Sequence, residues 1–324
     1  MFAVFATGSD AGRPLDHLRL GEYRDPDPPP GWAVVRVKAT SLNHHDLWTL
    51  RGVTPPGQRL PVVLGSEAAG IDHEGNEVIV YPVINEARTY PGNETLDPRH
   101  RVLSESHDGT FAELVTVPRH CLIPKPTHLN FVAAACLPGT WLTAYRMLFT
   151  AVRLPPESTV LVQGAGGGVA TALVCLGTAV GHRIWVTSRS EIKRENALRR
   201  GADAAFATGT RLPRQVDAVM ETVGQDTWRH SIQATRPGGS IVVSGATSGA
   251  MPAAFLRHIF MKQLSIIGVK LGTRAELEDL VRLCGQTGVY PPLNRVVPLV
   301  DARSGFAALA RGEVFGKIVF TVGG

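Results

Sequence analysis

A glycine-rich run in the middle of the chain has a composition suited to holding phosphate groups. It reads Thr159-Val-Leu-Val-Gln163-Gly164-Ala-Gly166-Gly167-Gly168-Val-Ala170. Glycine lets a backbone approach a pyrophosphate closely, and the start of a helix offers unpaired N–H groups and a partial positive charge. The run fits Gly164-x-x-Gly167-x-x-Ala170 better than the GxGxxG spelling. The alternative is a glycine-rich turn without a ligand. The expected dinucleotide contacts are Gly164, Gly166, Gly167, Gly168 and Val169.

The residues after the next apolar segment bear on which dinucleotide is bound. In such folds an acidic residue about 20 residues onward holds the ribose diol of NAD. Here residues 183–187 are followed by Ser188-Arg189-Ser190, whose hydroxyls and guanidinium suit a 2′-phosphate, and Lys193 or Arg194 adds charge. We therefore expect NADPH rather than NADH. The structural alternative makes Ser190 a helix N-cap and Arg189 a surface charge.

A second polar group combines residue types that bind metals, namely His44, His45, Asp46 and Glu67. Adjacent histidines of an extended segment face opposite ways, so they seldom reach one metal. We expect Asp46 and Glu67 instead to support a neighbouring site or to bind an arginine or backbone N–H groups. The cysteines are far apart and form no CxxC pair, so they predict neither a disulfide framework nor a cysteine-rich zinc lobe.

The composition is that of a globular protein. Of 324 residues, 44% are hydrophobic and 19% charged, enough for a buried core in about two domains. The net charge of +5 comes without a basic block, so we expect no nucleic-acid partner. Glycines interrupt the uncharged stretch 160–181, so we expect no membrane span. Separated cysteines and an N-terminus without a signal pattern favour the cytoplasm.

Two kinds of sequence pattern indicate which secondary-structure elements position these residues. The first 125 residues contain many prolines and short alternating segments, with strands expected at 33–39, 77–81 and 111–117. A helical stretch at 131–149, kinked at Pro138, leads into alternating strands and helices, which predict a parallel sheet. Its strands are expected at 159–163, 183–187, 204–206, 216–220, 240–244 and 264–268.

Helix signals support this division. Ser190 opens a helix that Gly201 closes, and Thr273 with Glu276 forms a capping box. Residues 316–322 predict a further strand. The expected fold is α/β, with a doubly wound parallel sheet and a separate β-rich part.

Landmarks along almost the full chain resemble the medium-chain dehydrogenase/reductase superfamily, which includes zinc-type alcohol dehydrogenases and zinc-free quinone oxidoreductases. They are Leu42-Asn43-His44-His45-Asp46, Pro61-Val-Val-Leu-Gly65-Ser66-Glu67-Ala-Ala-Gly70, Asp108-Gly-Thr-Phe-Ala-Glu113, the glycine loop, and Phe315-Gly316-Lys317-Ile318-Val319. The resemblance implies a GroES-like catalytic domain at 1–128 and 271–324 and a Rossmann domain at 129–270. It also implies hydride transfer to or from a nicotinamide cofactor.

The same resemblance implies that the zinc ligands are lost. Zinc-type members carry ligands at the positions of Asn43, Ser66 and Gly139, and an amide, a hydroxyl and a glycine are poor replacements. The lobe that holds a structural zinc in relatives corresponds to about 82–106, a stretch without cysteine. Glu86 and Thr89 stand near its first expected positions. We expect no bound metal.

Without a metal, hydrogen-bond donors must stabilise the substrate oxygen. The candidates are the Asn43 amide, the imidazoles of His44 and His45, and the cofactor's ribose hydroxyls. Zinc-free relatives tend to have Asn at this position. In an extended segment Asn43 and His45 share a face, so we expect Asn43 to bind the oxygen and His45 to supply the proton. His44 would face the phosphates or the interior, and each histidine has a structural alternative.

The resemblance places further contacts on loops that follow later strands and on the C-terminal landmark. The expected cofactor contacts there are Gly245, Thr247, Val269 and Lys317. The expected substrate-pocket residues are Trp48, Ser66 and Trp141, although Trp48 also fits an ordinary core position.

These observations predict a zinc-independent, NADPH-dependent oxidoreductase that reduces quinones, enones or related activated carbonyls. One alternative is an alcohol or aldehyde dehydrogenase of the same superfamily, and another is a protein that binds NADPH without turnover. The expected partners are a small-molecule substrate and a second copy of the chain, paired through an edge strand near 264–269.

Overall fold

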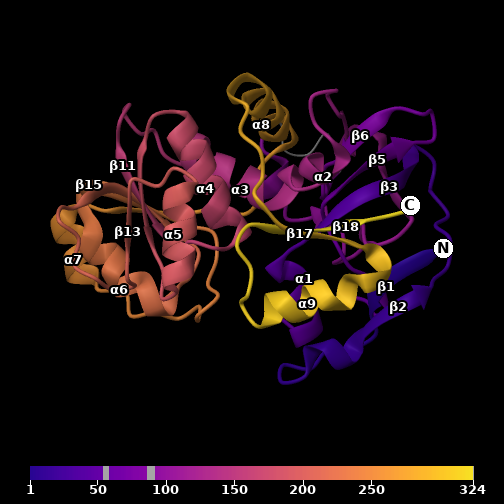
Figure 1. Cartoon of the computed structure of the whole chain (residues 1–324), viewed down its shortest axis with the longest axis horizontal. Coiled ribbons are helices and arrows are strands. Elements are labelled where there is room, and N and C mark those ends of the chain that lie inside the picture. The colour runs from indigo at the N-terminus through magenta and orange to yellow at the C-terminus, as the bar shows by residue number, and fades with distance from the viewer. Residues whose placement is uncertain (54–57, 86–91, 324) are drawn as a thin grey trace. The chain divides into compact units, whose positions relative to one another are not determined.

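The computed structural model describes residues 1–53, 58–85 and 92–323, and the chain divides into two compact units (Figure 1). Unit 1 comprises Met1–Gly139, Thr273–Val281 and Leu293–Gly324. Unit 2 comprises Thr140–Gly272 and Arg282–Pro292. The domain boundaries expected from the sequence, 128/129 and 270/271, stay predictions.

Unit 2 is organised around a parallel sheet whose strands lie in the order β13-β12-β11-β14-β15-β16. In chain order this is 3-2-1-4-5-6, the arrangement of a doubly wound dinucleotide-binding sheet. Burial on both faces explains the apolar run 160–162 of the central strand β11, in which every residue is buried. The α/β fold class is confirmed. The strands are β11 (Thr159–Gln163), β12 (Arg183–Thr187), β13 (Ala204–Phe206), β14 (Val216–Glu221), β15 (Thr235–Val243) and β16 (Ser265–Gly268).

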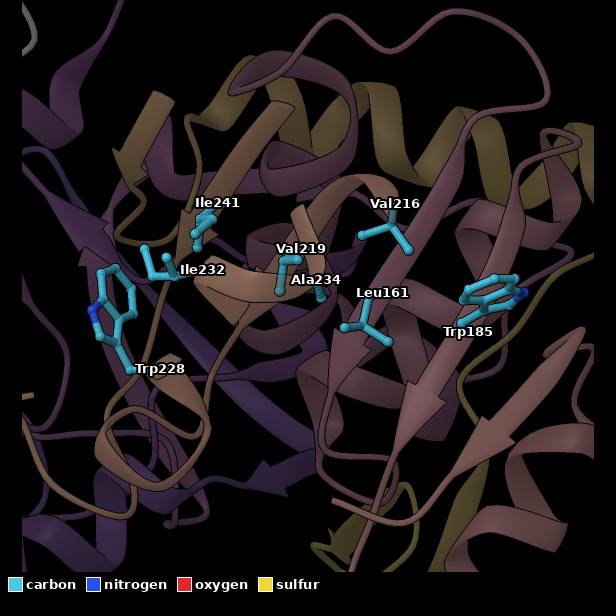
Figure 2. Packing of buried hydrophobic residues seen from close by; sticks show 8 residues of the cluster. All are labelled: Leu161, Trp185, Val216, Val219, Trp228, Ile232, Ala234 and Ile241. Carbon is cyan, nitrogen blue, oxygen red and sulfur yellow. The ribbon is translucent and has the colours of Figure 1, made fainter. Parts of the chain in front are cut away.

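Helices connect these strands and cover a hydrophobic core (Figure 2). Leu161, Val219 and Ile241 come from three neighbouring strands and lie with Trp228 and Ile232 of the helix after β14. Each large aliphatic side chain buried in this way contributes about 1.5–3 kcal/mol. The helices are α3 (Leu142–Tyr145), η5 (Arg146–Thr150), α4 (Gly168–Ala179), α5 (Glu191–Arg199), α6 (Gln225–Ala234) and α7 (Leu256–Lys262). Two further helices, η4 (Leu137–Trp141) and α8 (Arg274–Thr287), cross from one unit to the other along the chain.

Unit 1 is rich in short antiparallel strands. Its largest sheet runs β10-β6-β5-β3-β18-β17, with β9 also paired to the long strand β3. Smaller sheets join β2, β1 and β4, and β7 with β8. The strands are β1 (Phe2–Ala6), β2 (Leu18–Glu22), β3 (Trp32–Leu42), β4 (Val62–Val63), β5 (Ala68–Asp72), β6 (Glu77–Val80), β7 (Val83–Ile84), β8 (Arg101–Val102), β9 (Leu114–Pro118), β10 (Leu122–Pro124), β17 (Leu293–Pro298) and β18 (Lys317–Thr321).

Three phenylalanines distant in sequence pack together in unit 1. The Phe111 ring meets Phe320 edge-on at 5.2 Å and Phe306 at 6.0 Å. This cluster anchors the C-terminal segment against the N-terminal strands, because all three rings are buried. The helical segments of unit 1 are η1 (Pro14–His17), α1 (His44–Arg51), η2 (Glu94–Leu96), η3 (Arg119–Cys121), α2 (Phe131–Ala134), η6 (Leu299–Asp301) and α9 (Ala302–Ala310).

The helical stretch expected at 131–149 is not one regular helix. It consists of α2, α3 and two wider π-helical segments, and the first of these contains Pro138. Proline removes a backbone donor, so the ladder of hydrogen bonds changes its spacing there. The expected capping box of α8 is present, with Thr273 N donating to Glu276 Oε2 at 2.6 Å and Glu276 N to Thr273 Oγ1 at 3.1 Å.

Candidate functional site

The glycine loop of unit 2 leaves backbone N–H groups open at a helix start. Gly164 follows β11 with a φ of +87°, a conformation that glycine adopts without strain. Gly167 caps α4, and the first helical bond runs from Thr171 N to Gly167 O at 2.9 Å. The N–H groups of residues 168–170, between Gly167 and Thr171, therefore have no intrahelical acceptor. A Cβ built on Gly167 would meet nothing within 4 Å, so an anion has room to approach this helix end.

The end of β12 shows which of the expected phosphate-binding groups are already engaged. Ser190 caps α5, accepting from Lys193 N at 3.4 Å, and Ser188 Oγ accepts from Ser190 N at 3.2 Å. Arg194 Nη1 donates to Ser188 O at 2.7 Å. Arg189 is exposed. Burial lowers the pKa of Lys193, and the charge of Arg189 lowers it further, so these two cations share one region of positive potential.

The later loops meet at the carboxyl ends of the parallel strands. Thr247 Oγ1 donates to Thr222 O at 3.4 Å, and a Cβ built on Gly245 would lie 2.9 Å from the same oxygen. Val269 N donates to Val243 O at 2.9 Å. The structure thus brings Gly245 and Thr247 beside the residue that follows β14. In doubly wound sheets this edge is where ligands bind.

A buried polar network that the sequence did not reveal supports this edge. Glu221, at the end of β14, accepts from Val223 N at 2.8 Å, from Gly224 N at 3.0 Å and from Ser231 Oγ at 2.6 Å. Ser231 also accepts from Gln163 Nε2 at 3.0 Å. Gln163 is the residue before the glycine loop, so the network holds in place the residue from which the loop starts. The sequence signal for this network is a Glu and a Gln, each of which is the last residue of an apolar strand.

In unit 1 the polar motif after β3 begins a helix, which corrects the expected extended geometry. Asn43 is extended, with φ −128° and ψ 161°, and α1 starts at His44. Asp46 drives this, because its Oδ2 accepts from Asn43 N at 2.9 Å, as acidic residues do at helix starts. The expectation that Asn43 and His45 share the face of an extended segment is therefore wrong. The Asn-x-x-Asp spacing was the available signal.

Asp46 is wholly buried and links α1 to the loop that contains Ser66. Its Oδ1 accepts from Gly65 N at 2.9 Å. Burial raises the pKa of Asp46 from 3.8 to about 6, although the positive charge of His45 and both backbone donors lower it. The carboxyl group therefore changes its charge in the weakly acidic range.

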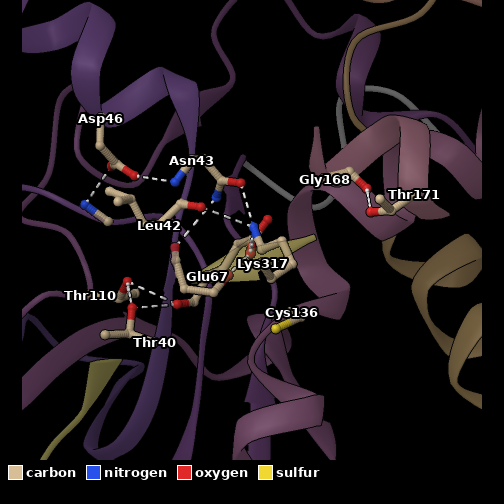
Figure 3. Close-up of polar contacts among 12 residues, drawn as sticks. Thr40, Leu42, Asn43, Asp46, Glu67, Thr110, Cys136, Gly168, Thr171 and Lys317 are labelled. Carbon is tan, nitrogen blue, oxygen red and sulfur yellow. Dashed lines mark hydrogen bonds and ion pairs between the residues drawn. The ribbon is translucent and has the colours of Figure 1, made fainter. Parts of the chain in front are cut away.

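Lys317 lies at the centre of a buried polar cluster of unit 1 (Figure 3). Its Nζ donates to Asn43 Oδ1 at 2.6 Å, to Glu67 Oε2 at 3.0 Å and to Leu42 O at 3.2 Å. Lys317 is 2% exposed and Glu67 is fully buried, while Asn43 is half-buried. Ser41 Oγ donates to the same Glu67 oxygen. Glu67 thus has a cationic partner, a lysine rather than an arginine, and the cofactor role of Lys317 stays a prediction.

His45 has a carboxylate partner that sequence reasoning missed. Its Nε2 lies 3.0 Å from Glu105 Oε1, and its Nδ1 lies 3.4 Å from Ser104 Oγ. Both ring nitrogens of this half-buried histidine are therefore engaged. His44 is exposed, and its ring lies 6.3 Å from that of Trp48 on the next turn of α1. No local pattern connects positions 45 and 105, so the pairing is visible only in the fold.

Asn43, Ser66 and Gly139 do not form a donor set that fits a tetrahedral zinc. Asn43 Oδ1 is bound to an ammonium group, and a Cβ built on Gly139 would overlap Glu67 Oε1. Ser66 is buried and offers a hydroxyl. Within the described ranges, no three His, Cys, Asp or Glu side chains gather to hold a metal. Glu86 and Thr89 lie outside the described residues. Trp141 of unit 2 is fully buried, so its place in a substrate pocket stays a prediction.

A doubly wound sheet with a glycine loop, joined to a β-rich unit with a buried polar cluster, defines a dinucleotide-binding oxidoreductase. Residues 29–127 match the family described as alcohol dehydrogenase GroES-like domain, and residues 168–286 match the family described as zinc-binding dehydrogenase. The chain belongs to the medium-chain dehydrogenase/reductase superfamily.

Individual relatives support this assignment over the whole chain. A zinc-type alcohol dehydrogenase-like protein of Schizosaccharomyces pombe is 30% identical, over 95% of this chain and 96% of that protein. The acryloyl-coenzyme A reductase of Metallosphaera sedula is 27% identical, over 99% of this chain and all of the relative. The crystal structure of an NAD-dependent alcohol dehydrogenase superposes with a TM-score of 0.92 at 32% identity, covering 100% of both chains. Among the described residues, no helix combines the length and apolarity needed to cross a bilayer.

Proposed function

We propose that the protein is a zinc-independent, NADPH-dependent reductase of activated carbonyl compounds: enones, quinones and α,β-unsaturated thioesters. The observation that carries this proposal is the Lys317 ammonium bound to Asn43 and Glu67. A divalent metal at this place would meet a positive charge and an amide oxygen that is already occupied. Hydrogen bonding is the chemistry that these groups support.

The reaction needs one hydride and one proton. A reduced nicotinamide cofactor, when bound, would supply the hydride for the β-carbon of an enone, and the glycine loop with Gly164 and Gly167 would hold its pyrophosphate. The reduction places a negative charge on the substrate's carbonyl oxygen, as an enolate. The amide N–H of Asn43 is the proposed donor to that oxygen. The imidazole of His45 is the proposed proton donor to the α-carbon, and Glu105, 3.0 Å from its Nε2, stabilises its protonated form.

The substrate class follows from the strength of these donors. A neutral amide stabilises a localised alkoxide less than a metal ion does, whereas an enolate or quinol spreads its charge over several atoms. The similarity to an acryloyl-coenzyme A reductase supports this choice, since acryloyl thioesters are activated carbonyls. The similarity to alcohol dehydrogenases favours the second candidate, a dehydrogenase of simple alcohols or aldehydes.

The cofactor proposal rests on the end of β12. Arg189 is exposed and Lys193 shares its positive region, whereas an NAD-specific fold places a carboxylate there. The similar NAD-dependent alcohol dehydrogenase indicates that the same fold also accepts NAD. Direct measurement therefore decides between the two nucleotides.

We also propose a homodimer in a reducing compartment such as the cytoplasm. β16 is the edge strand of its sheet, and Leu256, Phe260 and Met261 of the neighbouring α7 are 65% to 69% exposed. An open strand edge beside apolar side chains supports pairing with a second copy. All four cysteines lie in the described ranges and are unpaired, which supports a reducing environment.

The deciding experiment compares matched substrates that differ only in conjugation. NADPH oxidation is followed with cyclohexenone and cyclohexanone, with crotonyl-CoA and butyryl-CoA, and with benzoquinone. We expect turnover of the conjugated members and of the quinone, but not of the saturated partners. Aldehydes are tested in the same assay, and simple alcohols are tested by following the reduction of NADP⁺. Faster turnover of these compounds would replace this proposal with the dehydrogenase. NADPH binding with no turnover of any compound would indicate a non-catalytic binding protein. Elemental analysis showing one zinc per chain, with activity lost to a chelator, would end the zinc-independent assignment.

A further inference from the structure

The contacts of Lys317 determine which way the Asn43 amide faces. An ammonium group only donates, so the Asn43 atom at 2.6 Å from Nζ must be the carbonyl oxygen Oδ1. The amide nitrogen Nδ2 therefore faces away from Lys317. Its nearest partner in unit 1 is Ser41 O at 3.5 Å, which is at the limit of a hydrogen bond. The amide N–H groups thus retain donor capacity.

Lys317 is itself held so that it cannot turn to another partner. Its three N–H donors match three acceptors, Asn43 Oδ1, Glu67 Oε2 and Leu42 O. Glu67 is fixed in turn by Ser41 and occupies the space that a side chain at Gly139 would fill. The pair is buried, so its geometry depends on the fold rather than on solvent (Figure 3).

A cation on the carbonyl oxygen of an amide also changes the other end of that amide. It withdraws electron density from the nitrogen, so each N–H becomes a stronger donor, and such cooperativity strengthens a bond by about 10–30%. Asn43 is half-buried and can reach a ligand, whereas Lys317 is 2% exposed and has its donors engaged within unit 1.

We propose that Lys317 is a positioning residue: it fixes the Asn43 side chain with Nδ2 presented to the substrate oxygen and transmits its positive charge through the amide. This inference rests on the proposed function, in which Asn43 binds that oxygen. Through the Asn43 amide, Lys317 therefore supplies part of the positive charge that a metal ion supplies in zinc-type relatives.

Kinetics test the inference in four variants, K317M, K317R, N43A and K317M/N43A, with the best substrate of the panel. We expect K317M to lower kcat about 10-fold, with the KM for NADPH little changed. K317R, which keeps the charge and the donors, should recover part of that loss. In the N43A background K317M should have no further effect on kcat. An equal loss with and without Asn43 would overturn the inference.

Burial of Glu67 requires a second form of the test. Because K317M leaves this carboxylate without its cation, the double variant K317M/E67Q keeps the site neutral and foldable. Its kcat should match that of K317M, and kcat in E67Q alone should fall less. A matched control is K262M, which removes a lysine that donates to Ile232 O, Gln233 O and Thr235 O in unit 2. We expect K262M to lower stability and leave kcat per folded molecule unchanged.

A spectroscopic readout separates this inference from the proposed function. With ¹⁵N-labelled asparagine, the Asn43 side-chain NH₂ resonances should shift in K317M/E67Q and stay near their original positions in K262M. If no substrate is turned over but these resonances shift, the proposed function fails and the positioning role stands. If substrates are reduced but the resonances do not move, the positioning role is wrong and the function stands.

Discussion

Among single residues, Arg189 is the one whose substitution tests whether the protein prefers NADPH to NADH. Its exposed guanidinium follows β12. In NAD-specific proteins with this fold, a carboxylate occupies that place and binds the ribose. One charge-assisted contact to a 2′-phosphate is worth roughly 1.5–3 kcal/mol, which corresponds to about 10- to 150-fold in affinity. We expect Arg189→Ala to weaken NADPH binding by this factor and leave NADH binding unchanged. Titration of both nucleotides into both proteins measures it, and equal losses for the two would remove the argument.

Glu105 is the residue whose role is tested most directly by an isosteric change. Glu105→Gln keeps a group of the same size beside His45 Nε2 and removes the negative charge. General acid catalysis contributes about 10²–10⁴-fold in rate, so we expect Glu105→Gln to lower kcat at least about 10-fold and His45→Ala to lower it more. Steady-state kinetics with saturating NADPH gives both values. Near-full activity of His45→Ala, with an unchanged pH profile, would mean that water or a ribose hydroxyl supplies the proton.

Asp46 makes stability depend on pH in an unusual direction for a carboxyl group. Its pKa is about 6 in the folded protein and 3.8 as the reference value. The native state therefore binds the proton more tightly, so this group's contribution is full below about pH 4 and is lost as pH rises through about 6. The change amounts to about 3 kcal/mol at roughly 1.4 kcal/mol per pH unit.

The neutral variant Asp46→Asn should lack this dependence. Relative to the wild type, its free energy of unfolding should improve by about 2 kcal/mol between pH 4 and pH 7. Urea unfolding at several pH values measures the difference, which cancels the contributions of all other titrating groups. Two parallel stability curves would show that Asp46 does not titrate in this range.

At the scale of elements, the turn between β11 and α4 allows the cofactor site to be tested apart from folding. Gly164 has φ +87°, so Gly164→Ala strains the backbone by about 1–2 kcal/mol. Gly167 has φ −74° and open space around its Cα, so Gly167→Ala should fold normally. If the loop holds a pyrophosphate, the new methyl group meets the ligand, and NADPH affinity should fall at least about 10-fold. Thermal melts and nucleotide titrations measure both, and unchanged affinity in Gly167→Ala would mean that the phosphate lies elsewhere.

The elements also show what could be read from the sequence. The strand, glycine turn and helix at 159–179 were predictable, because apolar runs, glycines and caps act on neighbouring residues. The start of α1 differs from the extended segment expected from the sequence, although Asn43 and Asp46 are its local signal. The contacts from His45 to Glu105 and from Asn43 to Lys317 span 60 and 274 residues. Such pairs depend on strand pairing, which no local pattern encodes.

At the scale of the whole molecule, the exposed apolar side chains of α7 predict the oligomeric state. Phe260 is 65% exposed on α7, and Ile266 is 43% exposed on β16, the edge strand that follows α7 in the chain. We expect a homodimer that Phe260→Asp, together with Ile266→Asp, converts to monomers, because buried charge opposes association. Analytical ultracentrifugation gives the mass, and Val300→Asp, at another exposed apolar position, serves as the control. A wild-type monomer at high concentration would rule out the pairing.

The absent side chain at position 139 has a consequence for how this sequence can change over evolutionary time. A cysteine introduced there would collide with the Glu67 carboxylate, which Ser41 and Lys317 hold in place. Replacing Lys317 first would leave the buried Glu67 carboxylate without its cation, which typically costs about 3–5 kcal/mol of stability. A substitution of Gly139 or of Lys317 alone is therefore expected to destabilise the protein. If the protein binds no metal, as we propose, this cluster opposes the gain of one through either of these two single substitutions.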